Sequence, residues 1–483
     1  MTSDAFSAMI PWNARNPWCD GCDLRAELAQ ARSEGRDLSS VEPEFAHLIA
    51  TPGADGAEWF QLVGGQRDYA WYQRANALLD RVQELPIRAN FPFVEPSDLV
   101  GIRSARPPRP APAPWSDDHA ALVGRIHGGL LGRIIGCQLG KPVEGWSRKN
   151  IQTIAAATDN YPLRHYIRQP TSAECEKIRK AMPWWIPPRE DDPAPWKRPM
   201  FLDQIEREGM LVDDDINYTV VGLGIVSMYG GGFTPMDVAQ YWTTHLPLAE
   251  TCSAERMAYR AFANCIMPPW SATWRNPYRE WIGAQIRADY FGYANPGDPQ
   301  RAAEFAWRDG CVSHVKNGIY GEMWVAAMLA ACFVENDWKR IIAVGLGEIP
   351  QRCRLRQGIE RVLAAHARGD TFDQLMDQLL AQTDIPDLGI HTISNAQVVA
   401  AALLYGEDDF TTTIGLSVMA GWDTDCNGAT VGSLFGIKHG SGGIPRSWTA
   451  PLKNRCRTAV PGWLDQPIDA LAARMADIVI ASA

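Results

Sequence analysis

Two acidic clusters lie far apart in the chain, and each precedes an apolar run that contains glycine. The first is Asp213-Asp214-Asp215, and the second is Asp423-Thr424-Asp425. Aspartate is favoured where a helix begins, because its carboxylate accepts hydrogen bonds from free N–H groups and faces the positive end of the helix dipole. A cap needs only one such side chain, so three in a row predict a further chemical role.

Five carboxylates can share one small volume only if cations neutralise them or some of them are protonated. Hard divalent cations bind oxygen ligands, and Mg²⁺ prefers six of them, water included. If the two helix starts met, Asp213, Asp214, Asp215, Asp423 and Asp425 would therefore bind metal. Ordinary capping on a solvated surface would explain a single cluster. Two clusters favour a metal site.

Two rows of glycines at four-residue spacing predict how the clusters meet. Glycines at this spacing lie on one face of a helix, where they allow a second backbone to approach. Each interior glycine costs a helix about 1 kcal/mol relative to alanine. Tight core packing alone would be a sufficient reason for the rows, but closely packed helices would also join the clusters. The rows are Gly124, Gly128, Gly132, Gly136 and Gly140, and Gly428, Gly432, Gly436 and Gly440.

The first row ends in Gly140-Lys141-Pro142-Val143-Glu144-Gly145, where glycine and then proline stop the helix. Glu144 by itself is typical of a solvated surface, but its position makes it a candidate third part of the site. His314, and His391 with Asn395, are weaker candidates, because single histidines are commonly structural. The sequence contains no P-loop, nucleophile elbow, dinucleotide-binding glycine motif or H-E-x-x-H motif.

The composition excludes several classes of protein. The chain has 483 residues, of which 46% are hydrophobic and 21% charged, as in globular proteins. Its net charge of −10 argues against nucleic-acid and membrane-surface partners. The 11 cysteines follow no repeated spacing, and the pair Cys19 and Cys22 has no second pair to complete a zinc site. With no secretory signal between Met1 and Trp12, we expect a cytoplasmic protein with reduced cysteines.

A proline-rich stretch divides the chain. Residues 1–103 predict an N-terminal helical extension of unknown role, with one helix at Arg67–Leu85. Residues 104–115 predict a linker in extended polyproline geometry. Residues 116–483 predict the catalytic domain. Strand-like alternation is scarce throughout, so the expected fold class is all-α.

Other elements of the domain follow from local patterns. The stretch Pro183–Pro199 is too rich in proline for a regular element and predicts a surface loop. Apolar runs predict short buried helices at Met323–Val334 and Asn395–Tyr405. Pro467 suits the first position of a final helix over Ile468–Ile480.

At three places the sequence resembles the ADP-ribosylglycohydrolase family, which includes the dinitrogenase-reductase-activating glycohydrolase. Gly128 to Gly145 resembles the family's opening helix and its L-G-x-P-x-E-G ending. Asp213-Asp214-Asp215 resembles its T-D-D-T element, and Gly421 to Ala429 resembles its G-G-D-T-D-T-N-A element. The three motifs occur in the family's order, and the first hundred residues lie outside the likeness.

The resemblance implies a compact bundle of helices with two neighbouring Mg²⁺ or Mn²⁺ ions at its centre. It also implies hydrolysis of the N-glycosidic bond of an ADP-ribosyl group. Glu144 would be a catalytic or substrate-gating acid, and His314 would lie near the substrate. The implied metal ligands are Asp214, Asp215, Asp423 and Asp425.

Three positions differ from the family's motifs. Asp213 stands where threonine is usual and adds a negative charge. Cys426 stands where a threonine hydroxyl would bind metal, and a thiol is a poor ligand for Mg²⁺. Trp422 replaces the second glycine. These differences concern the second metal position, the identity of the metal and the specificity for ADP-ribose.

The leading interpretation is a metal-dependent N-glycoside hydrolase, in which Asp425 or Glu144 acts as general base. Trp422, Asn427 and His314 are the expected substrate-binding residues. The substrate would be an ADP-ribosylated protein or a small ribosyl compound such as a nucleoside. A non-catalytic protein that binds an ADP-ribose-like ligand on the same fold is the other alternative. The sequence does not indicate the oligomeric state.

Overall fold

The computed structural model describes residues 24–50, 69–108, 114–116, 118–185, 187 and 200–482. These residues form helices almost throughout, so the expected all-α fold is confirmed. The described strands are β1 (Arg455–Arg457) and β2 (Asp465–Pro467), which pair antiparallel with Cys456 opposite Gln466. Cys19 and Cys22, and most of the proline-rich stretches, lie outside the described residues. No helix within the described ranges is both long and apolar enough to cross a membrane.

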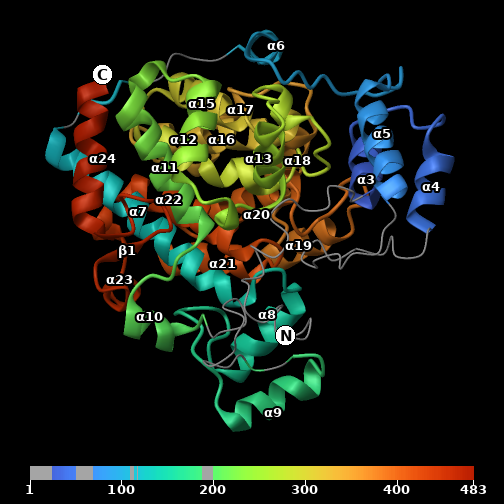
Figure 1. Cartoon of the computed structure of the whole chain (residues 1–483). Helices are drawn as coiled ribbons and strands as arrows, with labels where there is room; N and C mark the ends of the chain where they lie inside the picture. The colour runs from blue at the N-terminus through green and yellow to red at the C-terminus, as the bar shows by residue number, and fades with distance from the viewer. Residues whose placement is uncertain are drawn as a thin grey trace, which may run out of the picture.

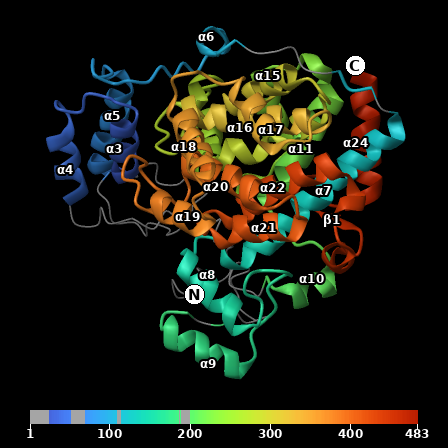
Figure 2. The same ribbon diagram turned by 180° about the vertical axis from the view of Figure 1, so that it is seen from behind.

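The N-terminal helices form a group at one side of the body, opposite the C-terminal helix (Figures 1 and 2). Their buried side chains, which include Phe45, Trp71 and Leu78, make a small core of their own. Buried ion pairs fasten the group to the body: Arg279 contacts Glu27 at 2.7 Å and Glu34 at 2.6 Å. The helices of this group are α3 (Leu24–Ser33), α4 (Glu42–Ala50) and α5 (Tyr69–Glu84). The next helix, α6 (Leu99–Ala105), lies apart from them along the body, and its Ile102 packs in the core of the body (Figures 1 and 2).

The body is a bundle around one large apolar core, and α8, α9 and α10 extend beyond it at one end (Figures 1 and 2). Short 3₁₀ turns join several of the helices. The helices are α7 (His119–Gly140), α8 (Arg148–Ala157), α9 (Ser172–Ala181), α10 (Leu202–Glu208), α11 (Asp214–Tyr229), α12 (Pro235–His245), α13 (Ser253–Ala263), α14 (Asp289–Tyr293), α15 (Pro299–Gly310), α16 (Lys316–Cys332), α17 (Trp338–Leu346), α18 (Arg354–Arg368), α19 (Phe372–Leu380), α20 (Thr392–Tyr405), α21 (Phe410–Met419), α22 (Thr424–His439), α23 (Arg446–Thr449) and α24 (Ile468–Ser482).

Helices α7 and α22 pack antiparallel along the two glycine rows. Gly128 faces Gly436, Gly132 faces Gly432, and Gly136 faces Gly428, each so closely that a Cβ would overlap the opposite backbone. The C-terminal end of α7 therefore meets the N-terminal end of α22. Gly124 differs from the rest of its row, because a Cβ there would meet nothing within 4 Å.

Two helices begin earlier than their apolar runs predicted. Helix α16 starts at Lys316 rather than Met323, and α20 starts at Thr392 rather than Asn395. Their first turns carry buried polar side chains, such as Asn317 and Thr392, that donate hydrogen bonds to Glu280 and to the carbonyl oxygen of Trp281 in a distant segment. A hydrophobic pattern does not detect such turns, because their burial depends on polar partners elsewhere in the chain.

Candidate metal centre

The first acidic cluster starts α11 in the expected way. Asp213 is the N-cap, and its Oδ1 accepts a hydrogen bond of 3.0 Å from the backbone N–H of Asp215. Asp214 and Asp215 occupy the first turn. The buried Arg133 of α7 donates to the carbonyl oxygen and to Oδ1 of Asp215, at 2.8 and 3.1 Å. The cap thus uses one carboxylate oxygen and leaves the others for different partners.

The second cluster is tied directly to the end of α7. The Thr424 hydroxyl donates to the carbonyl oxygen of Gly140 at 2.9 Å, and the N–H of Gly145 donates to the carbonyl oxygen of Trp422 at 3.0 Å. Trp422 itself has a left-handed backbone, with φ of +66°. These contacts hold the segment from Gly140 to Gly145, with Lys141 and Glu144, against the start of α22.

A third element supports the second cluster from behind. Oδ1 of Asn395 on α20 accepts a bond of 2.7 Å from Nδ2 of Asn427 and one of 3.4 Å from the backbone N–H of Asp423. Both asparagine side chains are fully buried. Asn395 therefore fixes the turn that presents Asp423.

Lys141 shows that the two clusters converge. Its Nζ lies 2.5 Å from Oδ2 of Asp213 and 3.3 Å from Oδ2 of Asp425, and the same Nζ is 3.4 Å from Oε2 of Glu144. One ammonium thus contacts an acid from each cluster and the acid of the connecting loop. The structure brings together the helix ends that the sequence placed far apart.

The donor set fits a hard divalent ion. Ligand atoms of Asp423, Asp425 and Cys426 lie within 4.8 Å of one another, as do those of Cys137, Asp213 and Asp215. The buried Oδ2 of Asp215 and Oδ1 of Asp423 and of Asp425 have no hydrogen-bond partner among the described residues. Buried carboxylate oxygens are costly without a partner, and a cation that binds oxygen would supply one.

The pKa values of the aspartates also indicate that the centre suits a cation. Burial, and then the charges of Asp425 and Glu144, raise the pKa of Asp423 well above its ordinary value. Burial and the charge of Glu144 raise the pKa of Asp425 to about 7. Burial also raises the pKa of Asp215, against the opposing effect of Arg133. In the absence of a cation, these groups therefore favour their protonated forms.

A protein-family profile described as ADP-ribosylglycohydrolase matches residues 118–480. The chain belongs to this family. Among solved structures, a chain of an "ADP-ribosylglycohydrolase-related protein complex" is 17% identical with a TM-score of 0.45, and the match covers 75% of this chain and 100% of that one. No curated protein matches the sequence.

Membership of the ADP-ribosylglycohydrolase family supports a glycohydrolase activity for this protein. The matched range contains all three motifs found in the sequence, and the N-terminal helices α3 to α6 lie outside it. The family resemblance inferred from the motifs is thereby confirmed.

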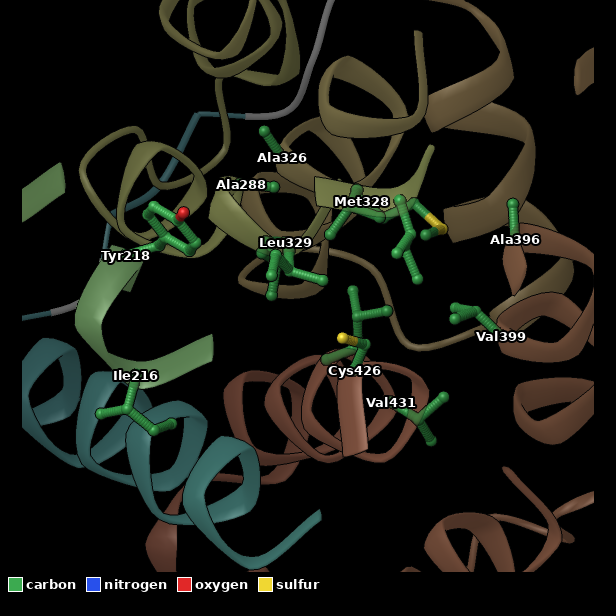
Figure 3. Close-up of a cluster of buried hydrophobic side chains, with 14 of the residues drawn as sticks. Ile216, Tyr218, Ala288, Ala326, Met328, Leu329, Ala396, Val399, Cys426 and Val431 are labelled. Carbon is green, nitrogen blue, oxygen red and sulfur yellow. The ribbon is translucent and has the colours of Figure 1, made fainter. Parts of the chain in front are cut away.

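The two positions that differ from the family at the metal centre have distinct surroundings. Burial, and then the charges of Asp215 and Asp423, raise the pKa of the Cys426 thiol well above its ordinary value, so the thiol stays protonated. Figure 3 shows Cys426 on α22 and Ile216 on α11 within the buried apolar cluster. Burial alone would raise the pKa of Asp213, but Lys141 holds it below its ordinary value.

The predicted substrate-binding residues are all buried. Trp422 is 7% exposed and Asn427 is fully covered. His314 contacts Ser313, with Nδ1 2.8 Å from the hydroxyl, and Nδ1 is 4.0 Å from Glu255. This polar cluster surrounds Arg287 rather than the aspartates of the metal centre. Their roles toward substrate stay predictions.

Sequence reasoning missed Lys141, Arg133 and Cys137. Arg133, Cys137 and Lys141 lie four residues apart in the sequence, so they share one face of the helix. This face points to the acidic clusters. Lys141 occupies the first variable position of the L-G-x-P-x-E-G motif, so the motif does not indicate a role for it. A signal was available, because a basic residue next to two acidic clusters joined by glycine rows predicts an ion pair.

Proposed function

We propose that the protein is a metal-dependent hydrolase that cleaves the N-glycosidic bond of an ADP-ribosyl or related ribosyl group. The observation that carries this proposal is the convergence, beside the Glu144 loop, of carboxylate oxygens from the starts of α11 and α22 that have no hydrogen-bond partner in the described part of the chain. Membership of the ADP-ribosylglycohydrolase family supports a glycosidic bond as the bond that is cleaved.

The metal ligands in this proposal are Asp214 and Asp215 from α11 and Asp423 and Asp425 from α22. Mg²⁺ or Mn²⁺, when bound, would supply oxygen coordination for ribose hydroxyls and polarise water. The residues supply rigidity, since Arg133 holds Asp215 and Asn395 holds the turn of Asp423. The ribose would then be oriented by groups that do not have to move.

Two acids suit the general base. The Glu144 side chain is 50% exposed, so water can reach it, and it lies next to the Lys141 ammonium. Asp425 is 3% exposed at its side chain, and its pKa of about 7 places its proton exchange near neutral pH. A base deprotonates water as it attacks the anomeric carbon, and the transition state resembles an oxocarbenium ion. We assign the role of general base to Glu144, because water can reach it, and the role of metal ligand to Asp425.

Glu144→Gln tests this assignment, with Glu176→Gln on the exposed face of α9 as the control. If Glu144 is the general base, Glu144→Gln should reduce the rate of hydrolysis by about 100-fold or more. Its affinity for Mn²⁺ should equal that of the parent. Full activity of Glu144→Gln would contradict it. If instead metal binding were lost with activity, Glu144 would be a ligand.

A direct assay distinguishes the two substrate classes, an ADP-ribosylated protein and a small ribosyl compound. Incubation with ADP-ribosylarginine and with a panel of nucleosides, each with Mn²⁺ and with chelator, shows which glycosidic bond is cleaved. We place an ADP-ribosylated protein first, because the family match covers the whole site. Cleavage of nucleosides alone would favour a small ribosyl metabolite, which the bulky Trp422 at a glycine position supports.

A non-catalytic binding protein is the remaining alternative, supported by the changes at positions 213, 422 and 426. Binding of ADP-ribose without hydrolysis of any panel member would establish it. The proposed compartment is the cytoplasm, supported by the free state of all nine described cysteines.

A further inference from the structure

The Lys141 ammonium lies among the carboxylates of the candidate metal centre. Its Nζ contacts Oδ2 of Asp213 at 2.5 Å and Oδ2 of Asp425 at 3.3 Å, so a single cation bridges the two acidic clusters. The lysine side chain is only 19% exposed, and that of Asp213 is fully covered. The ammonium is therefore enclosed in the centre rather than held at its rim.

An ammonium and a divalent ion compete for the same carboxylate oxygen. Mg²⁺ binds oxygen at about 2.0–2.1 Å, so an ion on Oδ2 of Asp213 would lie against the Lys141 ammonium and be repelled by it. Displacing Lys141 would leave its charge in a buried setting without its main partner, which is costly. Asp213 therefore pairs with Lys141 and does not bind a metal ion.

The second altered position removes another donor. Cys426 presents a soft sulfur among the candidate ligand atoms, where a hydroxyl oxygen would suit a hard ion. The oxygens that stay without a partner among the described residues belong to Asp215, Asp423 and Asp425. With Asp214 and water they are enough for one octahedral ion.

We infer that this chain binds one divalent ion, held mainly by the α22 cluster, and that the Lys141 ammonium paired with Asp213 takes the place of a second ion. Lys141 is a positioning residue, because it fixes Asp213 and Asp425 by charge. The inference rests on the proposed function and specifies its metal content.

Manganese content and magnetism test this inference without an activity assay. After equilibrium dialysis of the full chain against saturating Mn²⁺, metal analysis should give one ion per chain, and electron paramagnetic resonance should show an isolated Mn²⁺ rather than an exchange-coupled pair. The triple variant Lys141→Met, Asp213→Thr and Cys426→Thr removes both buried charges together, which protects its folding, and places a hydroxyl donor at position 426. It should bind two ions and show the coupled spectrum.

Lys149→Met, at an exposed lysine of α8, is the matched control and should bind one ion like the parent chain. Two coupled ions in the parent would overturn the inference and leave the proposed function intact. One ion in both the parent and the triple variant would also overturn it, because these positions would then not be what limits the count. No bound ion in the parent would contradict the proposed function itself.

Discussion

Gly132 and Gly432 face each other across α7 and α22 so closely that a Cβ on either would overlap the carbonyl oxygen of the other. This contact is one of a series that ends at Gly140, where a Cβ would overlap the backbone of Thr424 and Asp425. The glycine rows thus do more than fill the core. They fix the distance between the loop that carries Lys141 and Glu144 and the start of α22.

Gly132→Ala should destabilise the protein by about 3 kcal/mol or more, because the new methyl group meets backbone that cannot move aside. Metal affinity should fall as well, since separating the helices moves Lys141 away from Asp425. Chemical unfolding and calorimetric titration with Mn²⁺ measure the two effects. Gly124→Ala, on the same helix, is the control and should be neutral or stabilising by up to about 1 kcal/mol. Equal effects of the two substitutions would refute the packing argument.

The glycine rows and the acidic helix starts could be predicted from the sequence because each is a local pattern with a local physical cost. Their convergence followed from one further step, that rows of small residues pack together. The roles of Lys141 and Arg133 could not be predicted in this way. Each side chain acts through partners on α11 or α22 that are distant in sequence, and only the fold brings those partners within reach.

The stability of the metal-free protein should depend on Asp425 and on pH. The ordinary pKa of this carboxyl is 3.8, and in the folded chain burial and Glu144 raise it to about 7. A raised pKa means that the folded state binds the proton more tightly, so the contribution to stability is present at low pH and is lost as the pH rises through about 7. Added Mn²⁺ should remove this loss, because the ion replaces the proton.

Unfolding of chelated protein at about pH 5 and about pH 8 measures this effect when wild type is compared with Asp425→Asn, which cannot ionise. The wild type should lose stability relative to the variant as the pH rises. A difference between the two proteins that does not change with pH would show that Asp425 is ionised throughout.

Arg279 should be essential for docking the N-terminal helices. It is 1% exposed and pairs with Glu27 and Glu34, so Arg279→Met leaves two buried carboxylates without it and should cost about 3–5 kcal/mol. Arg275, which pairs with the exposed Asp80, also links this group to the body. Arg275→Met should cost less than about 1 kcal/mol. Similar losses for the two variants, by chemical unfolding, would contradict the role assigned to the buried network.

Asn395→Ala should weaken the second cluster from behind. The buried Nδ2 of Asn427 would lose its acceptor, at a cost of about 1–3 kcal/mol, and the turn that carries Asp423 would become less fixed. Mn²⁺ affinity should therefore fall several-fold in calorimetric titration. Asn264→Ala, at an exposed helix end, is the control and should leave affinity unchanged. Parent-like affinity of Asn395→Ala would show that Asp423 does not need this support.

The most direct measurement is calorimetric titration of Mn²⁺ into chelated Asp214→Asn and Asp425→Asn, each compared with the parent chain. One substitution lies at the start of α11 and the other at the start of α22. A centre built jointly by the two helix ends predicts that either change alone reduces affinity at least about 100-fold, since each removes a charged oxygen ligand. Parent-like affinity in either variant would contradict a shared centre.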